Sequence, residues 1–151
     1  MTRAEKAKNN FLNGLNCTQA ILLAFADLID VPEETLKAVG LPMGGGMGRL
    51  RQTCGTVTGA AMCLGLLFPE KSKGEMYALV QELAKRFAEK NGSYNCGELL
   101  TGAGIRTDSS PNPSQRTAEY YKKRPCPDLA YDAAEILEEI CREQGRISSE
   151  G

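Results

Sequence analysis

Helix-start signals recur along the chain and restrict it to a helical fold. A capping box pairs Ser, Thr, Asp or Asn at the N-cap with Glu or Gln three residues later, and each side chain binds the other's backbone N–H. The pairs are Thr2 with Glu5, Asn16 with Gln19, Ser72 with Glu75, and Asn95 with Glu98. Apolar residues at helical spacing follow these pairs, whereas no segment alternates apolar and polar residues as a half-buried strand does. We therefore expect an all-α protein.

The expected helices form one compact domain over residues 1–151. Turn signals separate about five to six of them, which begin near Thr2, Cys17, Pro32, Cys54, Ser72 and Pro127. The second should run from Cys17 to about Ile29. Residues 101–125 contain three prolines and few large apolar side chains. We expect a long loop or flap there, before the last helix, with one helical turn near 118–121.

Four of the six cysteines stand at expected helix starts: Cys17, Cys54, Cys96 and Cys126. Asn16 and Asn95 precede two of them as N-caps, and Thr53 would cap the helix that Cys54 enters. Pro127 suits the first helical position, which would make Cys126 the N-cap itself. Unpaired amides and the positive end of the helix dipole lower the pKa of such a thiol below its usual value of about 8.5.

Four such thiols converging would make a redox or metal site. A single cysteine near a helix start is more often a small buried apolar residue. We interpret Cys63 and Cys141, which lie inside helices, in that way.

Composition and charge exclude several classes of protein. Eighteen basic and nineteen acidic residues are interspersed and give a net charge of -1, which provides no field for nucleic acid. The apolar stretches are too short for membrane insertion, and no signal peptide precedes Phe11, so we expect a cytoplasmic protein. In a reducing compartment, cysteines serve more often as ligands or working thiols than as disulfide staples. The chain has no histidine, which removes any Cys–His catalytic pair.

A glycine-rich segment precedes the second of these cysteines. Gly44, Gly45, Gly46 and Gly48 permit backbone conformations closed to other residues, so the segment can bring amides close to an anion or a cofactor. It is not a Walker loop, because Arg49 follows where a lysine and a hydroxyl residue are required. The alternative is tight packing of the segment over the domain.

Small residues line one face of the expected central helix. Gly55, Gly59 and Cys63 recur every four residues, so a neighbouring helix can approach closely. Helices about 8 to 10 Å apart bring facing Cα atoms into the range of about 4.4 to 6.8 Å that a disulfide requires. Arg49 and Arg51 shortly precede Cys54 and should favour its thiolate. Cys54 is therefore the candidate catalytic nucleophile, with Cys17 as the resolving thiol.

Three short strings and two lone cysteines carry a family resemblance. They are NCTQA at 16–20, GGGMGR at 44–49, CGTVTG at 54–59, and then Cys96 and Cys126. Together they resemble the C-GCAxxG-C-C family of redox-active proteins over nearly the whole chain. Thr56 stands where alanine is usual, which leaves the cysteine and the glycine of the motif in place.

The resemblance implies a small prokaryotic protein whose characteristic residues are Cys17, Cys54, Cys96 and Cys126. A similar module occurs in split-Soret cytochromes beside an iron–sulfur cluster. The resemblance therefore implies a [2Fe–2S] cluster bound by the same four cysteines. The residues expected to contact a bound cofactor are Gly44, Gly45, Gly46, Gly48, Arg49, Gly55 and Gly59. Without a Cys-x-x-Cys-His motif, covalent haem is not expected.

Three functions remain open at this point. We expect the site to transfer electrons through a [2Fe–2S] cluster. The alternatives are a metal-free thiol/disulfide oxidoreductase or redox sensor, and structural zinc in an interaction module. No two cysteines lie within four residues of each other, which is unlike zinc knuckles and the common ferredoxins. The partner would be a redox protein or a small thiol or disulfide, and a homodimer is the default for a small helical protein.

Overall fold

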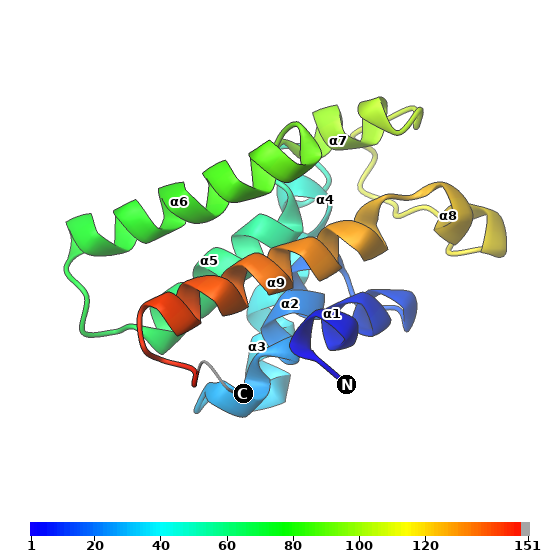
Figure 1. The fold of residues 1–151 in the computed structure, drawn as a ribbon. Helices are drawn as coiled ribbons and strands as arrows, with labels where there is room; N and C mark the ends of the chain where they lie inside the picture. The colour runs from blue at the N-terminus through cyan, green and yellow to red at the C-terminus, as the bar shows by residue number, and fades with distance from the viewer. Residues whose placement is uncertain (149–151) are drawn as a thin grey trace.

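The structure is a computed structural model that describes residues 1–148, and it is a bundle of helices (Figure 1). Two 3-10 turns, η1 (Ala26–Leu28) and η2 (Leu41–Met43), link some of the helices. The α-helices are α1 (Arg3–Leu12), α2 (Cys17–Ala24), α3 (Glu33–Gly40), α4 (Gly44–Met47), α5 (Gly55–Leu67), α6 (Lys73–Asn91), α7 (Cys96–Gly102), α8 (Ala118–Lys123) and α9 (Cys126–Glu143). Residues 1–148 contain no strand beyond an isolated bridge between Thr53 and Asn95. The all-α prediction is confirmed, with more helices than expected.

The predicted caps account for most of the helix starts. Complete capping boxes begin α1 at Thr2, α2 at Asn16 and α6 at Ser72. The Asn95 side chain accepts the backbone N–H of Glu98 at the start of α7. Each cap satisfies amides that the first turn leaves unpaired, which stabilises a helix by about 1 kcal/mol.

The second helix is shorter than predicted. It ends at Ala24 instead of about Ile29, and Ala26–Leu28 forms the 3-10 turn η1. The Phe25 N–H is shared among three preceding carbonyls, and such tightening of the last turn is common where a helix ends. Phe25 and Ile29 are both buried on either side of this turn.

Three helices form the centre of the bundle. α2, α5 and α9 contact one another, α1 packs on α2 and α9, and α6 packs on α5 and α9. α7, α8 and the irregular segment 103–117 lie toward the right of Figure 1. α8 confirms the helical turn predicted near 118–121. No helix among residues 1–148 is both long enough and apolar enough to cross a membrane.

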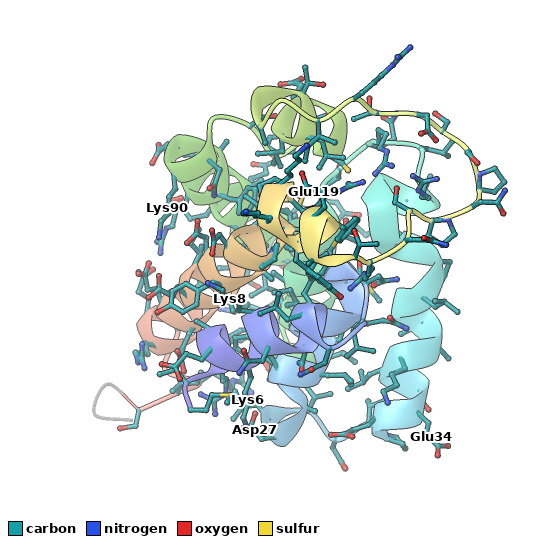
Figure 2. The ribbon with its side chains drawn as sticks, turned by 90° about the vertical axis from the view of Figure 1, so that its right-hand side faces the viewer. Lys6, Lys8, Asp27, Glu34, Lys90 and Glu119 are labelled. Atoms are coloured by element: carbon teal, nitrogen blue, oxygen red, sulfur yellow. The ribbon has the colours of Figure 1, made fainter. Side chains whose placement is uncertain are left out.

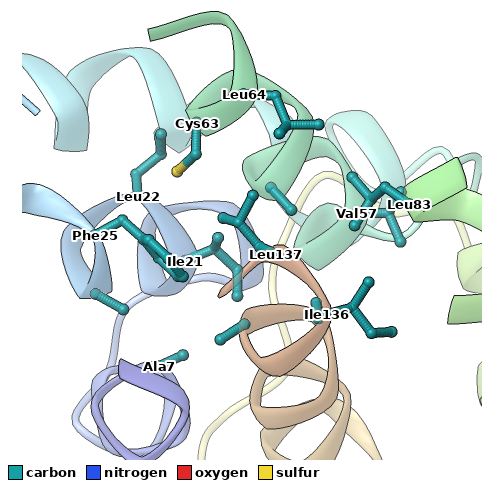
Figure 3. Close-up of a cluster of buried hydrophobic side chains, with 14 of the residues drawn as sticks. Ala7, Ile21, Leu22, Phe25, Val57, Cys63, Leu64, Leu83, Ile136 and Leu137 are labelled. Atoms are coloured by element: carbon teal, nitrogen blue, oxygen red, sulfur yellow. The ribbon is translucent and has the colours of Figure 1, made fainter. Parts of the chain in front are cut away.

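Side chains from these helices fill one core (Figure 3). Ile21, Leu22 and Phe25 from α2 and its C-cap belong to the same buried cluster as Leu64 of α5 and Leu137 of α9. α5 is apolar on nearly all sides, as expected of a central helix. Charged side chains point outward from different elements in Figure 2, where Lys6, Lys8, Asp27, Glu34, Lys90 and Glu119 are labelled.

The predicted small-residue face lets α5 approach α2 closely. A Cβ atom added at Gly59 would lie 2.9 Å from the Thr18 carbonyl oxygen and 3.0 Å from Ile21 Cβ. One added at Gly55 would lie 2.8 Å from Thr18 Oγ1 and 3.0 Å from Cys17 Cβ. The buried Thr18 hydroxyl donates to the Gly55 carbonyl at 3.0 Å. The contact therefore brings the start of α2 beside the start of α5.

We predict that Gly59→Ala lowers the free energy of unfolding by about 1 to 3 kcal/mol, because the added methyl group overpacks this contact. Gly65→Ala is the matched control: it lies in the same helix with nothing within 4 Å of the added Cβ, and should stabilise by about 0.5 to 1 kcal/mol. Urea denaturation of both variants measures the difference. Equal effects would contradict the close packing.

Candidate functional site

All four predicted cysteines occupy helix starts, but two of them exchange the positions expected for them. Cys17 and Cys96 are the first residues of α2 and α7. Cys54 is itself the N-cap of α5, because Thr53 is held in the bridge to Asn95 and does not cap the helix. Cys126 is the first residue of α9.

The prediction that Cys126 is an N-cap is therefore wrong. Pro125 takes that position, with helical backbone angles φ −77° and ψ −13°. Proline is compatible with the first turn of a helix, so Pro127 is accommodated as the second residue of α9.

The four thiols lie close enough to influence one another. The interaction between Cys17 and Cys126 is the largest cause of the pKa shift of each of these two thiols. The charge of Cys17 raises the pKa of both Cys54 and Cys96. All six cysteines are free thiols, and Cys63 and Cys141 are fully buried in the core, as expected from the sequence.

Cys17 is the thiol best prepared to ionise. Its pKa is lowered to about 6, chiefly because Cys126 donates a hydrogen bond to it. The backbone N–H groups of Gly45 and of Cys17 itself also stabilise the thiolate, as does the charge of Arg116, while burial opposes them. Two of these donors are amides of the kind predicted at a helix start and in the glycine-rich segment.

The other three thiols are held in their protonated form. Burial is the first cause that raises the pKa of Cys54 to about 12, and the neighbouring charge of Cys17 adds to it. Burial also raises the pKa of Cys96, against the opposing effect of Arg51. Donation to Cys17 is the main reason why the pKa of Cys126 rises well above its ordinary value. The site thus contains one thiolate, Cys17, and three protonated thiols.

Thr56, the departure from the family pattern, contacts Cys54. Its buried hydroxyl oxygen lies 3.1 Å from Cys54 Sγ. This hydrogen bond lowers the pKa of Cys54, but burial outweighs it. Thr56 therefore contributes a polar neighbour to a thiol that is otherwise enclosed by the core.

The glycine-rich segment forms a left-handed turn. Gly45, Gly46, Met47, Gly48 and Arg49 have positive φ angles between 58° and 74°, and Arg51 has φ 60°. Left-handed backbone costs non-glycine residues roughly 1 to 2 kcal/mol each, so the surrounding contacts must hold it in place. The turn directs the Gly45 N–H at Cys17.

Gly46 is packed directly against another cysteine of the site. A Cβ atom added there would lie 2.7 Å from Cys96 Cβ and 2.6 Å from the Gln52 backbone nitrogen. Gly44 packs equally tightly on Asn16, with 2.6 Å from its added Cβ to Asn16 Nδ2. The segment therefore does both things that the sequence suggested: it packs over the domain and presents an amide to the site.

Arg49 and Arg51 do not act on Cys54 as expected. The left-handed backbone directs Arg49 to the carbonyl oxygens of Ser110 and Asn112 and to the Asp108 carboxylate at 3.6 Å. Arg51 Nε donates to the Asp108 carbonyl at 3.1 Å, and Arg51 Nη1 lies 3.7 Å from Cys96 Sγ. Both arginines thus tie the predicted flap to the glycine-rich segment.

A pocket of about 580 Å³ opens onto the thiols. The flap contributes Pro111, Pro113, Ser114 and Arg116 to its wall, and the glycine-rich segment contributes Gly44, Gly45, Gly48 and Arg49. Three cysteines, Cys17, Cys96 and Cys126, line it, whereas Cys54 does not. Gly46, Gly55 and Gly59 also lie outside the lining, because they pack elements together.

Residues that the sequence did not single out complete the pocket. Arg116 Nη1 donates to the Phe11 carbonyl at 2.7 Å, and its guanidinium lies 4.3 Å from the centre of the Phe11 ring. Arg124 stacks on Tyr120 at 4.7 Å. Arg124 stands two residues before Cys126, which was a usable signal, but nothing in the sequence linked Arg116 to Cys17.

The donor set matches a metal centre in chemistry but not in placement. Thiolates are the natural ligands of iron–sulfur clusters and zinc. Across residues 1–148, no group of three or more Cys, Asp or Glu side chains is arranged to hold a metal ion. The arrangement present is a pair of interacting thiols, Cys17 and Cys126, with two further thiols nearby.

Comparison with known proteins identifies the family. Residues 15–140 match the family model described as "Putative redox-active protein (C_GCAxxG_C_C)". The chain therefore belongs to this family of redox-active proteins, as the sequence motifs indicated. An uncharacterized protein of Archaeoglobus fulgidus is 25% identical over 162 residues, covering 95% of this chain and 99% of the relative. No solved structure shows a significant match.

We predict that Cys17 alkylation follows an ionisation near pH 6. Because only the thiolate reacts, the rate should rise with pH through about 6 and then level off. Iodoacetamide labelling at several pH values, located by peptide mass spectrometry, measures this. Cys126→Ala should move the midpoint upward, since it removes the principal hydrogen bond. A wild-type midpoint near the ordinary thiol pKa of about 8.5 would contradict the described site.

We predict that Arg49→Gln exposes the flap to proteolysis. Arg106 is exposed within the flap, and the loss of the Arg49 contacts to Ser110 and Asn112 should speed trypsin cleavage after it severalfold. Arg86→Gln is the control, because Arg86 pairs with Glu143 away from the flap. Unchanged cleavage at Arg106 would show that the flap is held by other contacts.

Proposed function

We propose that this protein is a thiol/disulfide oxidoreductase in which Cys17 is the nucleophile and Cys126 the resolving thiol. The observation that carries the proposal is that Cys17 and Cys126 line the same pocket and that each is the largest cause of the other's pKa shift. Cys54, the nucleophile expected from the sequence, is buried with a pKa near 12 and does not line the pocket. In this proposal Cys17 is the nucleophile instead of Cys54.

The reaction needs no group beyond these thiols and a substrate disulfide. The Cys17 thiolate attacks one substrate sulfur, forms a mixed disulfide and releases the first substrate thiolate. Cys126 then gives its proton to the first substrate thiolate and attacks the Cys17 sulfur, which releases the second substrate thiolate, and this thiolate takes up a proton from water. The products are a Cys17–Cys126 disulfide and two substrate thiols, so two electrons pass from the protein to the substrate.

The pKa values of the pair suit the two steps. With a pKa of about 6, Cys17 is about nine-tenths thiolate at pH 7. Its hydrogen bond with Cys126 is broken when Cys17 forms the mixed disulfide, which removes the main cause of the high pKa of Cys126. The resolving thiol therefore becomes easier to ionise only after the first step has occurred.

Electron transfer through a [2Fe–2S] cluster is the second candidate. One observation favours it: four thiols from four helix starts are near enough to interact electrostatically. Cys17, Cys54, Cys96 and Cys126 would be the ligands, and amides such as that of Gly45 would donate to their sulfurs. Structural zinc bound by the same four cysteines is the third candidate. No contact in the structure favours it over the other two.

The first test is an absorption spectrum of protein purified without oxygen, with iron, sulfide and zinc assayed on the same sample. The proposal predicts a colourless, metal-free protein that reduces a small disulfide in one turnover. Visible bands with matching iron and sulfide would instead establish the cluster, and stoichiometric zinc would establish the structural metal site.

Cysteine variants separate the roles of the thiols. Cys17→Ser should reduce the rate to that of uncatalysed exchange, whereas Cys126→Ser should stop at the mixed disulfide, visible by intact mass. Cys63→Ala and Cys141→Ala are controls, because both side chains lie in the core, and should retain the wild-type rate. Equal loss in all four variants would contradict a specific site.

A further inference from the structure

The pocket beside the thiols is basic although the protein is nearly neutral. Its lining includes Arg49, Arg51, Arg116 and Arg124 but no aspartate or glutamate. The net charge of the whole chain is only -1. Arginine charge is thus concentrated where the thiols are accessible.

Three of these four arginines have no carboxylate partner among residues 1–148. Arg49 has the Asp108 carboxylate at 3.6 Å, but Asp108 is exposed and does not line the pocket. The partners of Arg51 are a carbonyl oxygen and the Cys96 sulfur, and those of Arg116 are the Phe11 carbonyl and two aromatic rings. Among the described residues, no carboxylate lies within ion-pair distance of Arg51, Arg116 or Arg124.

The four arginines are also held in place. Arg116 and Arg124 both stack on Tyr120, and Arg49 and Arg51 project from the strained left-handed turn. All four side chains belong to residues that are partly buried. Guanidinium groups fixed in this way bind carboxylates strongly, because little side-chain freedom is lost and each can donate two parallel hydrogen bonds.

Apolar residues form much of the remaining wall. Phe11, Leu41, Pro42, Leu100, Pro111 and Pro113 surround the arginines. A volume of about 580 Å³ suits a small molecule. The arginines come from two segments, the glycine-rich turn and the stretch that runs through the flap to α9, which suits a ligand with more than one anionic group on an apolar body.

We propose that the pocket takes a small disulfide whose two halves carry carboxylate groups. This inference rests on the proposed function and specifies its substrate class. The arginines bind the carboxylates and place a substrate sulfur at the Cys17 thiolate. The exchange steps are those given above, with two carboxylate-bearing thiols released and the Cys17–Cys126 disulfide left in the protein.

Three disulfides of similar size but different charge test the inference. They are dithiodipropionate, which is dianionic, hydroxyethyl disulfide, which is neutral, and cystamine, which is dicationic. Each is mixed with reduced, desalted protein, and the single-turnover rate constant is divided by that for dithiothreitol with the same disulfide. This division removes the intrinsic reactivity of each disulfide.

The normalised rate should be at least about tenfold higher for the dianion than for the neutral disulfide, and lowest for the dication, because charge-assisted pairs in a partly buried pocket contribute this much. The preference should fall as salt is added. Equal normalised rates for all three would overturn the inference while leaving the oxidoreductase proposal intact.

Arginine variants locate the preference. Arg124→Gln and Arg116→Gln should each reduce the dianion-to-neutral ratio about tenfold. Both arginines also lower thiol pKa values. The rate with the neutral disulfide measures this effect on thiol reactivity, and the dianion-to-neutral ratio measures recognition of the carboxylates. Lys122→Gln is the matched control, because Lys122 is exposed on α8 and does not line the pocket.

A binding measurement tests the pocket without any redox step. Suberate has the length and charge of dithiodipropionate but no sulfur, and octanediol is its neutral counterpart. Calorimetry with Cys17→Ser protein should show suberate binding at least about tenfold more tightly than octanediol, and Arg116→Gln should remove the difference. If no disulfide reacts but suberate binds, the oxidoreductase proposal and the disulfide substrate fail, and the anion-binding pocket stands. Equal binding of the two would overturn the anionic pocket whatever the thiols do.

Discussion

The close contact between α2 and α5 is the constraint on which the site depends. Gly55 and Gly59 have no side chains, so the α5 backbone lies against Thr18 and Cys17. The buried Thr18 hydroxyl fixes the register by donating to the Gly55 carbonyl. Any larger residue on this face would separate Cys54 from Cys17 and shift both helix starts away from α9. The packing of two helices thus determines how near the thiols lie to one another.

Packing holds the left-handed turn between α3 and α5 in place, and the turn positions several groups of the site. Met47, Arg49 and Arg51 occupy backbone conformations that are unfavourable for their side chains, and such residues concentrate at functional sites. The gain is an amide aimed at Cys17 and two guanidinium groups aimed at the flap and Cys96. Gly46, wedged against Cys96, links this turn to α7. Strain in one short segment therefore organises parts of the pocket that lie far apart in sequence.

Sequence patterns predicted what is local and missed what is tertiary. Capping boxes depend on residues three apart, so the starts at Thr2, Asn16 and Ser72 were predictable. The swap between Cys54 and Cys126 arose from a long-range bridge at Thr53 and from a helical Pro125, neither of which a local pattern reveals. The contacts of Arg49 and Arg51 depend on positive φ angles, and Arg116 reaches Cys17 only through the flap. The four-cysteine set came from the motif, whereas the different burial and pKa shifts of the four thiols required the fold.

The wide sequence separation of the four cysteines ties their reactivity to folding. Cys17 and Cys126 stand near opposite ends of the chain, and Cys126 begins the last helix. The hydrogen bond that lowers the pKa of Cys17 therefore exists only after α9 has docked against α2. Until then each thiol has the ordinary pKa of about 8.5 and stays largely protonated at neutral pH. The lowered pKa of Cys17 is thus a property that the chain acquires only when its tertiary structure has formed.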